Sequence, residues 1–263
     1  MDTGLNGKIA LVAAASKGLG RAIADAFAAE GASLAICARD AEGLEGARKS
    51  IERIAKAPVH AVAADLSRTE GIERVVRTTL ERFGRVDVLV TNAGGPPVGT
   101  FESLEWSAWQ SAVELTLRSA VELTRAVLPG MRERGWGRVL HITSLAVKQP
   151  IDGLMLSTSI RAAVTGFSRT LANEVAVDGV TVNTILPGFM NTERVVELNQ
   201  ATAAREGVPV EQVDRRFREQ IPMRRIGEPH ELAALATFLA SERASYITGQ
   251  SIAVDGGWIR SLL

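Results

Sequence analysis

The chain has 263 residues, 46% of them hydrophobic, and its 30 Lys and Arg residues balance its 30 Asp and Glu residues. The zero net charge argues against nucleic-acid partners and against a polybasic membrane-binding surface. The single cysteine, Cys37, excludes an internal disulfide framework and a cysteine-rich metal site, and we expect no bound metal. The first residues lack the order of a signal peptide and no apolar run approaches the ~18 residues of a membrane span, which predicts a soluble cytoplasmic protein.

Short β-branched and aliphatic runs alternate with amphipathic stretches, a pattern that predicts a parallel sheet with crossover helices. The predicted strands are Ile9–Ala13, Ser33–Ala38, Val59–Ala63, Val86–Thr91, Arg138–Thr143, Thr181–Leu186 and Ser251–Val254. The predicted helices are Leu19–Glu30, Glu42–Lys56, Thr69–Phe83, Trp106–Arg134, Leu154–Val177 and Glu228–Ala240. Most strands are apolar on both faces, which indicates that helices cover both sides of the sheet.

Two places depart from this rhythm. Pro129 lies near the end of the longest predicted helix, which should stop or kink there because proline lacks the amide donor. Residues 191–226 are predicted to form a lid or binding segment, because a long excursion between a turn and the last helix is more often a lid than a core element. Its arginines alternate with acidic residues, which favours a salt-bridged helix face over an anion-binding surface. These arginines are Arg194, Arg205, Arg215, Arg216 and Arg218.

A glycine-containing turn follows the first strand and opens the first helix. Its glycines would let the backbone approach a pyrophosphate, while free amides and the helix dipole supply the attraction. The candidate cofactor-binding residues of this turn are Ser16, Lys17, Gly18, Leu19 and Gly20. A structural turn without a ligand would use the same glycines, so the motif alone leaves both interpretations open.

The second strand ends in Ala38-Arg39-Asp40, about twenty residues further on, where a ribose-recognising group belongs. Arg39, helped by Lys17, is suited to hold a 2′-phosphate, which favours NADP(H) over NAD(H) as the cofactor. The alternative for each cation is a solvated surface charge, and Asp40 weakens the preference.

Together with these residues, sequence motifs spread over nearly the whole chain resemble those of the classical short-chain dehydrogenase/reductase family. Gly18 and Gly20 match the family's Thr-Gly-x3-Gly-x-Gly motif, although Ala13 and Ala14 replace its threonine and first glycine. Residues 246–257 resemble its C-terminal signature. The resemblance implies further cofactor contacts at Asp65 and Leu66 after the third strand, at Asn92, Ala93 and Gly94 after the fourth, and at Pro187, Gly188 and Thr192.

The resemblance implies a single-domain α/β protein with a three-layer Rossmann fold and a doubly wound, seven-stranded parallel sheet. It also implies an NADP(H)-dependent oxidoreductase that acts on a carbonyl or hydroxyl group of a small-molecule substrate, similar to the 3-oxoacyl-[acyl-carrier-protein] reductases. The long fourth and fifth helices resemble those that pair between subunits in the family. A homo-oligomer, either a dimer or a tetramer, is expected by this analogy.

The family's catalytic tetrad, Asn…Ser…Tyr-x3-Lys, is not reproduced in this sequence. Alignment on the family's lysine segment places Arg161 at the lysine and Ser157 at the tyrosine. Ser144 lies 157 − 144 = 13 residues upstream, which is the family's serine-to-tyrosine interval. Thr116 falls at the asparagine position, and the chain's one tyrosine, Tyr246, belongs to the C-terminal signature. Only the serine is unchanged.

These replacements change the expected chemistry. Arginine stays protonated and cannot relay a proton as lysine can, so Arg161 is predicted to be a fixed charge that orients a ribose, holds an anion or stabilises an oxyanion. Ser144 and Ser157 would polarise a carbonyl, with the proton arriving through water. Two alternatives stay open: a non-redox lyase, isomerase or dehalogenase-like enzyme on the same scaffold, and a non-catalytic dinucleotide-binding protein.

Three other residues are candidates for chemistry. His141, on the strand before Ser144, is predicted to point to the opposite face as a core histidine. Asp152, in the loop before Ser157, is the better candidate for a base, although a solvated carboxylate is the favoured interpretation. Cys37, within a strand, is expected to be a small buried hydrophobe.

Overall fold

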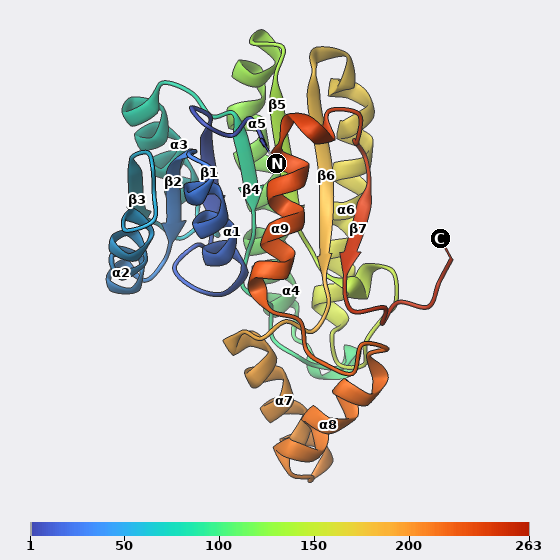
Figure 1. Ribbon diagram of the computed structural model, residues 1–263. Coiled ribbons are helices and arrows are strands. Elements are labelled where there is room, and N and C mark those ends of the chain that lie inside the picture. The colour runs from blue at the N-terminus through green and yellow to red at the C-terminus, as the bar shows by residue number, and fades with distance from the viewer. Residues whose placement is uncertain (1, 263) are drawn as a thin grey trace.

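The computed structural model describes residues 2–262 and confirms a seven-stranded parallel sheet with the order β3-β2-β1-β4-β5-β6-β7 (Figure 1). The strands are β1 (Ile9–Ala13), β2 (Ser33–Ala38), β3 (Val59–Ala63), β4 (Val88–Thr91), β5 (Gly137–Ile142), β6 (Val180–Pro187) and β7 (Ser251–Val254). Every residue of β1 and β4 is buried, as expected of apolar strands covered on both faces. The strand order reverses between β1 and β4, and ligands of doubly wound sheets bind at such a reversal.

Helices cover both faces of the sheet and complete the three predicted layers. They are α1 (Gly18–Ala29), α2 (Ala41–Glu52), α3 (Thr69–Phe83), α4 (Trp106–Ala112), α5 (Ser119–Glu133), α6 (Met155–Val175), α7 (Glu193–Glu206), α8 (Val210–Gln220) and α9 (Pro229–Ala240). Buried side chains of α1, α2 and α9 form one apolar core with the sheet, while those of α3, α5 and α6 form a second core on its other face. In Figure 1, α1 and α9 lie in front of the sheet.

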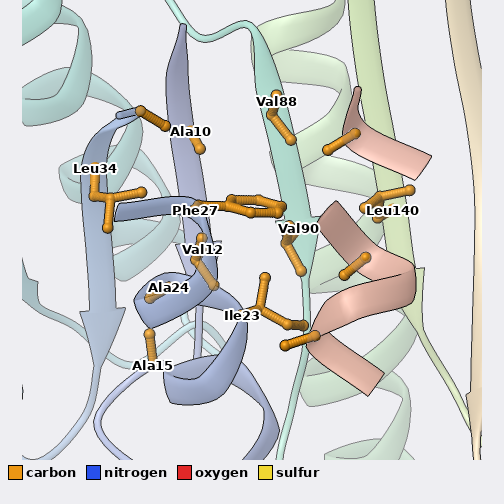
Figure 2. Packing of buried hydrophobic residues seen from close by; sticks show 14 of the residues in the cluster. Ala10, Val12, Ala15, Ile23, Ala24, Phe27, Leu34, Val88, Val90 and Leu140 are labelled. Atoms are coloured by element: carbon orange, nitrogen blue, oxygen red, sulfur yellow. The ribbon is translucent and has the colours of Figure 1, made fainter. Parts of the chain in front are cut away.

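Helix α1 is held on the sheet by its apolar face. Ile23 and Phe27 are four residues apart, lie on the same side of the helix and are fully buried. Figure 2 shows the Phe27 ring lying across the sheet near Val12 of β1 and Val90 of β4. This packing fixes the N-terminus of α1 at the carboxyl end of β1, where the glycine-containing turn lies.

The helix predicted over Trp106–Arg134 consists of three segments. Helix α4 ends at Ala112, a π-helical segment follows over Val113–Arg118, and α5 begins at Ser119. The helix does not stop at Pro129, since α5 continues to Glu133. Both Pro129 and Arg125, whose carbonyl loses its helical donor, are exposed, so water can satisfy that carbonyl. The departure from α-helical geometry lies earlier, where no proline marks it.

Helices α7 and α8 form a pair that projects beyond the carboxyl ends of the strands (Figure 1). A small apolar cluster joins the pair to the body of the protein. The ring of Phe189 stacks on Phe217 of α8, with centroids 4.5 Å apart, and meets Trp258 edge-on at 5.8 Å. Within residues 2–262, none of the helices combines the length and apolar character needed to cross a membrane.

Candidate active site

One cavity of about 1160 Å³ opens at the carboxyl ends of the central strands. Its lining includes fifteen of the eighteen site residues expected from the sequence: Ser16, Lys17, Gly18, Leu19, Arg39, Leu66, Asn92, Ala93, Gly94, Ser144, Ser157, Arg161, Pro187, Gly188 and Thr192. Gly20, Asp65 and Thr116 lie outside the lining. The glycine turn and three of the four residues predicted for catalysis, Ser144, Ser157 and Arg161, therefore share a single continuous space.

The turn after β1 provides a backbone cradle at one end of the cavity. Gly18 has a φ of +60°, in the left-handed region that favours glycine, and Gly20 packs so tightly that a Cβ would lie 2.3 Å from the Ala14 carbonyl oxygen. Lys17 occupies the N-cap of α1 without capping it through its side chain, which leaves first-turn amides free of a side-chain acceptor. This geometry suits a phosphate group, because free amides and the helix dipole both attract anions.

Ala14 departs from the glycine pattern in this turn. Its φ is +52°, so an alanine occupies the left-handed conformation where the resembled motif has its first glycine. The residue also lines the cavity, and its methyl group narrows the cradle. The backbone conformation of the motif is thus retained, although alanine takes the place of the glycine that usually adopts it.

The charged residues at this end are used in different ways. The Lys17 ammonium forms an ion pair with Glu193 at the start of α7, and this hydrogen-bonded partner raises the pKa of Lys17. Asp40 caps α2 by accepting a hydrogen bond from the Glu42 amide at 3.2 Å. Arg39 is exposed and forms no hydrogen bond or ion pair with the residues described, 2–262. Arg39 is therefore the cation that is free to meet a ligand phosphate.

Asp65 shapes the neighbouring turn and does not face the cavity. Its Oδ1 accepts hydrogen bonds from the amide and the hydroxyl of Ser67, at 3.0 and 2.8 Å. Burial opposes ionisation of this carboxyl group, but the Ser67 donors and the charges of Arg39 and Arg68 together lower its pKa. The adjacent Leu66 lines the cavity instead.

Arg161 lies at the opposite end of the cavity, on α6. Its Nη1 donates to the carbonyls of Ile142 and Thr143, both at 3.0 Å, and its Nη2 donates to the carbonyl of Ala93 at 3.1 Å. Burial, together with the charge of Arg194, lowers the pKa of Arg161 to about 10. The guanidinium is still protonated at neutral pH, and it ties α6 to the ends of β4 and β5.

Two hydroxyl groups line the same end of the cavity. The Ser144 Oγ accepts a hydrogen bond from the Ala146 amide at 3.1 Å, which leaves its own hydrogen available for donation. Ser157 is the third residue of α6 and is buried, and its hydroxyl forms no hydrogen bond with the other residues described. Both serines can therefore donate to an oxygen atom of a ligand.

Thr116 does not join this group. It lies in the π-helical segment, and its buried hydroxyl has no hydrogen-bond partner among residues 2–262. Its neighbour Leu115 lines the cavity in its place. The structure therefore separates Thr116 from the other three predicted catalytic residues.

The remaining candidates also lie outside the cavity lining. His141 is fully buried, as predicted, but only its Nδ1 is satisfied, by the Thr91 hydroxyl at 2.7 Å, and Nε2 has no partner within the described chain. Burial lowers the pKa of His141 to about 4. Cys37 is buried, which raises the pKa of its thiol to about 12, while Asp152 and Tyr246 are exposed.

The sequence did not single out Arg194 as a cavity residue. Its Nη2 donates to the Pro96 carbonyl at 2.8 Å, and its guanidinium lies against Gly95, where a Cβ would be 2.5 Å from Nε and Nη2. It also pairs with Glu197 at 3.3 Å. The predicted salt-bridged helix face is confirmed at Arg218, which pairs with Asp214 on α8. Only the seating of α7 against residues 93–96 shows that Arg194 faces inward.

Comparison with known proteins agrees with this geometry. A family profile described as enoyl-(acyl carrier protein) reductase matches residues 13–259. A D-beta-hydroxybutyrate dehydrogenase of Cupriavidus necator is 36% identical, with 97% of this chain and 99% of the relative covered. A 3-oxoacyl-[acyl-carrier-protein] reductase of Vibrio cholerae is 35% identical, with 96% and 98% covered.

A solved structure extends the likeness to three dimensions. L-sorbose reductase from Gluconobacter frateurii, complexed with NADPH and L-sorbose, superposes with a TM-score of 0.94 over 100% of both chains, at 36% identity. The profile match covers most of the chain, and each of these relatives is a dehydrogenase or reductase. The chain belongs to the short-chain dehydrogenase/reductase family of oxidoreductases.

Proposed function

We propose that this protein is an NADP(H)-dependent oxidoreductase that interconverts a carbonyl and a hydroxyl group on a small molecule. The observation that carries the proposal is the single cavity, which runs from the turn at Gly18 and the free cation Arg39 to Ser144, Ser157 and Arg161. A dinucleotide needs such an extended space, with phosphate-binding amides at one end and reacting groups at the other.

The residues at the turn fit the phosphorylated cofactor. The first-turn amides of α1 would receive the pyrophosphate, and Arg39 would receive the 2′-phosphate, since it has no competing partner within residues 2–262. Thr192 and Gly188 line the cavity where the strand β6 ends and would flank the nicotinamide end. Bound there, the cofactor supplies or accepts the hydride.

The chain's own contribution to the reaction lies in Ser144, Ser157 and Arg161. Both serine hydroxyls would donate hydrogen bonds to the substrate oxygen, and the fixed positive charge behind them would stabilise negative charge as it develops there. None of the three releases a proton at neutral pH, so water entering the cavity delivers it. General acid catalysis typically contributes ~10²- to 10⁴-fold, and we expect a correspondingly slow reaction with unactivated ketones.

Residues 191–226 would serve as the substrate lid. Helix α7 contributes Glu193, Arg194 and Glu197 to the cavity wall, and it contacts the phosphate turn through the Lys17–Glu193 ion pair. A homo-oligomer, dimeric or tetrameric, is proposed by analogy with the family.

The proposal is tested by titrating the protein with NADPH and with NADH, followed by nicotinamide fluorescence. NADPH should bind at least about tenfold more tightly than NADH, and Arg39→Ala should remove most of that difference, because a charge-assisted hydrogen bond contributes ~1.5–3 kcal/mol.

Oxidation of bound NADPH is then followed with ketones, 3-oxoacyl thioesters and quinones. Tight binding without any turnover would indicate a non-catalytic dinucleotide-binding protein, and turnover of a hydroxy acid or halohydrin without dinucleotide binding would indicate a non-redox enzyme.

A further inference from the structure

The reaction end of the cavity holds a buried positive charge without a counter-ion. Arg161 is buried, and its three hydrogen bonds go to backbone carbonyls, which carry no formal charge. Within the described chain, 2–262, no carboxylate forms an ion pair with it. A buried cation is costly unless an anion compensates it. The site is therefore short of negative charge where the substrate would bind.

A second guanidinium, carried by another helix, contacts the same stretch of chain. Arg161 on α6 donates to the carbonyl of Ala93, and Arg194 on α7 donates to the carbonyl of Pro96. The Arg194 guanidinium also lies directly against Gly95. The two arginines thus hold the four-residue segment 93–96 between them, and both line the cavity.

The acidic residues of the cavity wall do not neutralise this pair. Glu193 is engaged with Lys17 at the cofactor end, and Asp40 caps α2. Glu197 pairs with Arg194 at 3.3 Å, but its side chain is 61% exposed, and exposed ion pairs are weak. Arg194 is close enough for its charge to lower the pKa of Arg161, so the two cations act on the same space. A ligand carboxylate would relieve that repulsion.

We propose that the substrate is a small oxo acid or hydroxy acid, whose carboxylate is recognised by Arg194 in the positive field of Arg161. Arginine binds carboxylates through a planar fork of N–H donors, and Arg161 retains donors at Nε and Nη2 beyond its three carbonyl contacts. Ser144 and Ser157 line the same end, so a carboxylate held there places a nearby carbonyl at the two hydroxyls. This inference rests on the proposed function, whose substrate class it names.

The test compares each acid with its uncharged methyl ester in binding, without turnover. Calorimetric titrations of the NADP⁺-saturated protein, and of the protein alone, use pyruvate, acetoacetate and levulinate, each with its methyl ester. Oxidised cofactor cannot reduce any of these ligands. The variant is Arg194→Gln, which keeps a polar side chain but shortens it and removes its charge.

Arg48→Gln on α2 is the matched control. Arg48 has a similar side-chain exposure, 27% against 33%, and also pairs with a glutamate three residues away, but it does not line the cavity. Circular dichroism of both variants checks that they fold as the wild type does.

We expect at least one acid to bind about tenfold or more tightly than its ester, because a charged hydrogen bond contributes on the order of a tenfold to hundredfold gain in affinity. Arg194→Gln should reduce that preference to below about threefold, and Arg48→Gln should keep it. Equal affinity for acid and ester in all three pairs, binding of none of the acids, or a preference that survives in Arg194→Gln would overturn the inference.

The same ligands, tested for NADPH oxidation, separate this inference from the proposed function. Reduction of neutral ketones without any preference for acids would contradict the carboxylate site and leave the reductase standing. An acid preference that depends on Arg194, without oxidation of NADPH by any substrate, would leave the carboxylate site standing and contradict the reductase.

Discussion

Ser157 and Arg161 are one helical turn apart on α6, and both side chains are buried at the cavity wall. The sequence alignment predicts that these positions correspond to the family's tyrosine and lysine, whose pairing lets the phenol transfer a proton. Here the guanidinium is engaged with the carbonyls of Ile142, Thr143 and Ala93, which holds it against the strand ends. A tyrosine at 157 alone would therefore gain little from the cation beside it.

We predict that Ser157→Tyr combined with Arg161→Lys raises reduction of simple ketones by at least about tenfold, since a positioned general acid contributes ~10²- to 10⁴-fold. Either change alone should have little effect, because Ser157→Tyr leaves the cation engaged with three backbone carbonyls, and Arg161→Lys leaves the site without a phenol. The measurement is NADPH oxidation at saturating cofactor. If the double variant binds NADPH normally and stays inactive, the alignment of the catalytic positions is wrong.

His141 makes the stability of the protein depend on pH. Its pKa is about 4 in the folded state, against an ordinary value near 6.5, because burial disfavours the charged ring. The unfolded chain therefore takes up a proton first, so stability from this residue is complete above about pH 6.5 and is lost as the pH falls toward 4. The expected loss is about 3 kcal/mol in total, or ~1.4 kcal/mol per pH unit within the window.

Urea unfolding between pH 8 and pH 5 measures this effect. The free energy of unfolding of His141→Gln should be lower than that of the wild type at pH 8 and should fall less steeply below pH 6.5, because glutamine does not titrate. Between pH 7.5 and 8.5, position 141 should add little to the pH dependence of the free energy of unfolding in either protein. Parallel curves for the two proteins throughout the range would show that His141 does not carry the pH dependence.

At the scale of the elements, a cluster at the amino-terminal edge of the sheet joins three parts of the chain. The Trp136 indole N–H donates to Glu242 at 2.8 Å. Its ring makes cation–π contacts with Lys8, 3.6 Å from the ring centroid, and with Arg138, at 4.3 Å. Glu242 lies 3.6 Å from the guanidinium of Arg138, which is only 2% exposed. The cluster therefore connects the entry to β1, strand β5 and the turn after α9.

We predict that Glu242→Gln lowers the free energy of unfolding by about 1–2 kcal/mol, because the buried Arg138 loses its carboxylate partner. This loss is smaller than that expected for a fully buried pair, because half of the Glu242 side chain is exposed. Urea unfolding measures the change, and Glu52→Gln, at an exposed pair on α2, should change it by less than about 0.5 kcal/mol. Equal free energies of unfolding for Glu242→Gln and wild type would show that the charge of Arg138 does not need the Glu242 carboxylate.

The elements themselves follow from local sequence, whereas their irregularities do not. Apolar runs such as Ile9–Ala13 predict buried strands because no other placement removes both faces from water. The π-helical segment at Val113–Arg118 has no such signature in the sequence, and in the structure it lies against α6. The position of Arg194 in the cavity wall could not be predicted either. In the sequence it is one of several arginines that alternate with acidic residues, and it faces the cavity only because α7 packs on residues 93–96. The place of Gly18 and Arg39 at the cavity could be predicted, because each lies shortly after a strand whose carboxyl end is set by the apolar pattern.

At the scale of the whole molecule, the Lys17–Glu193 ion pair links the glycine-containing turn after β1 to the first residue of α7. Both side chains are 68% exposed, so the pair is weak, and it adds to the apolar cluster around Phe189 and to the Arg194–Pro96 hydrogen bond, which also join the lid to the body. Glu193 raises the pKa of Lys17 and occupies its ammonium group, which a cofactor 2′-phosphate would also attract. With the proposed cofactor, binding of NADPH would therefore compete with this contact between the body and α7.

Glu193→Gln should consequently increase the affinity for NADPH by a few-fold, because Lys17 becomes free to join Arg39 at the phosphate and an exposed pair contributes at most ~1 kcal/mol. Affinity for NADH, which lacks the 2′-phosphate, should change by less than about twofold, and hydrogen exchange in α7 should rise in the cofactor-free protein. Fluorescence titration with both dinucleotides measures the first two effects. A loss of NADPH affinity in Glu193→Gln would mean that the ion pair positions Lys17 for the phosphate and does not compete with it.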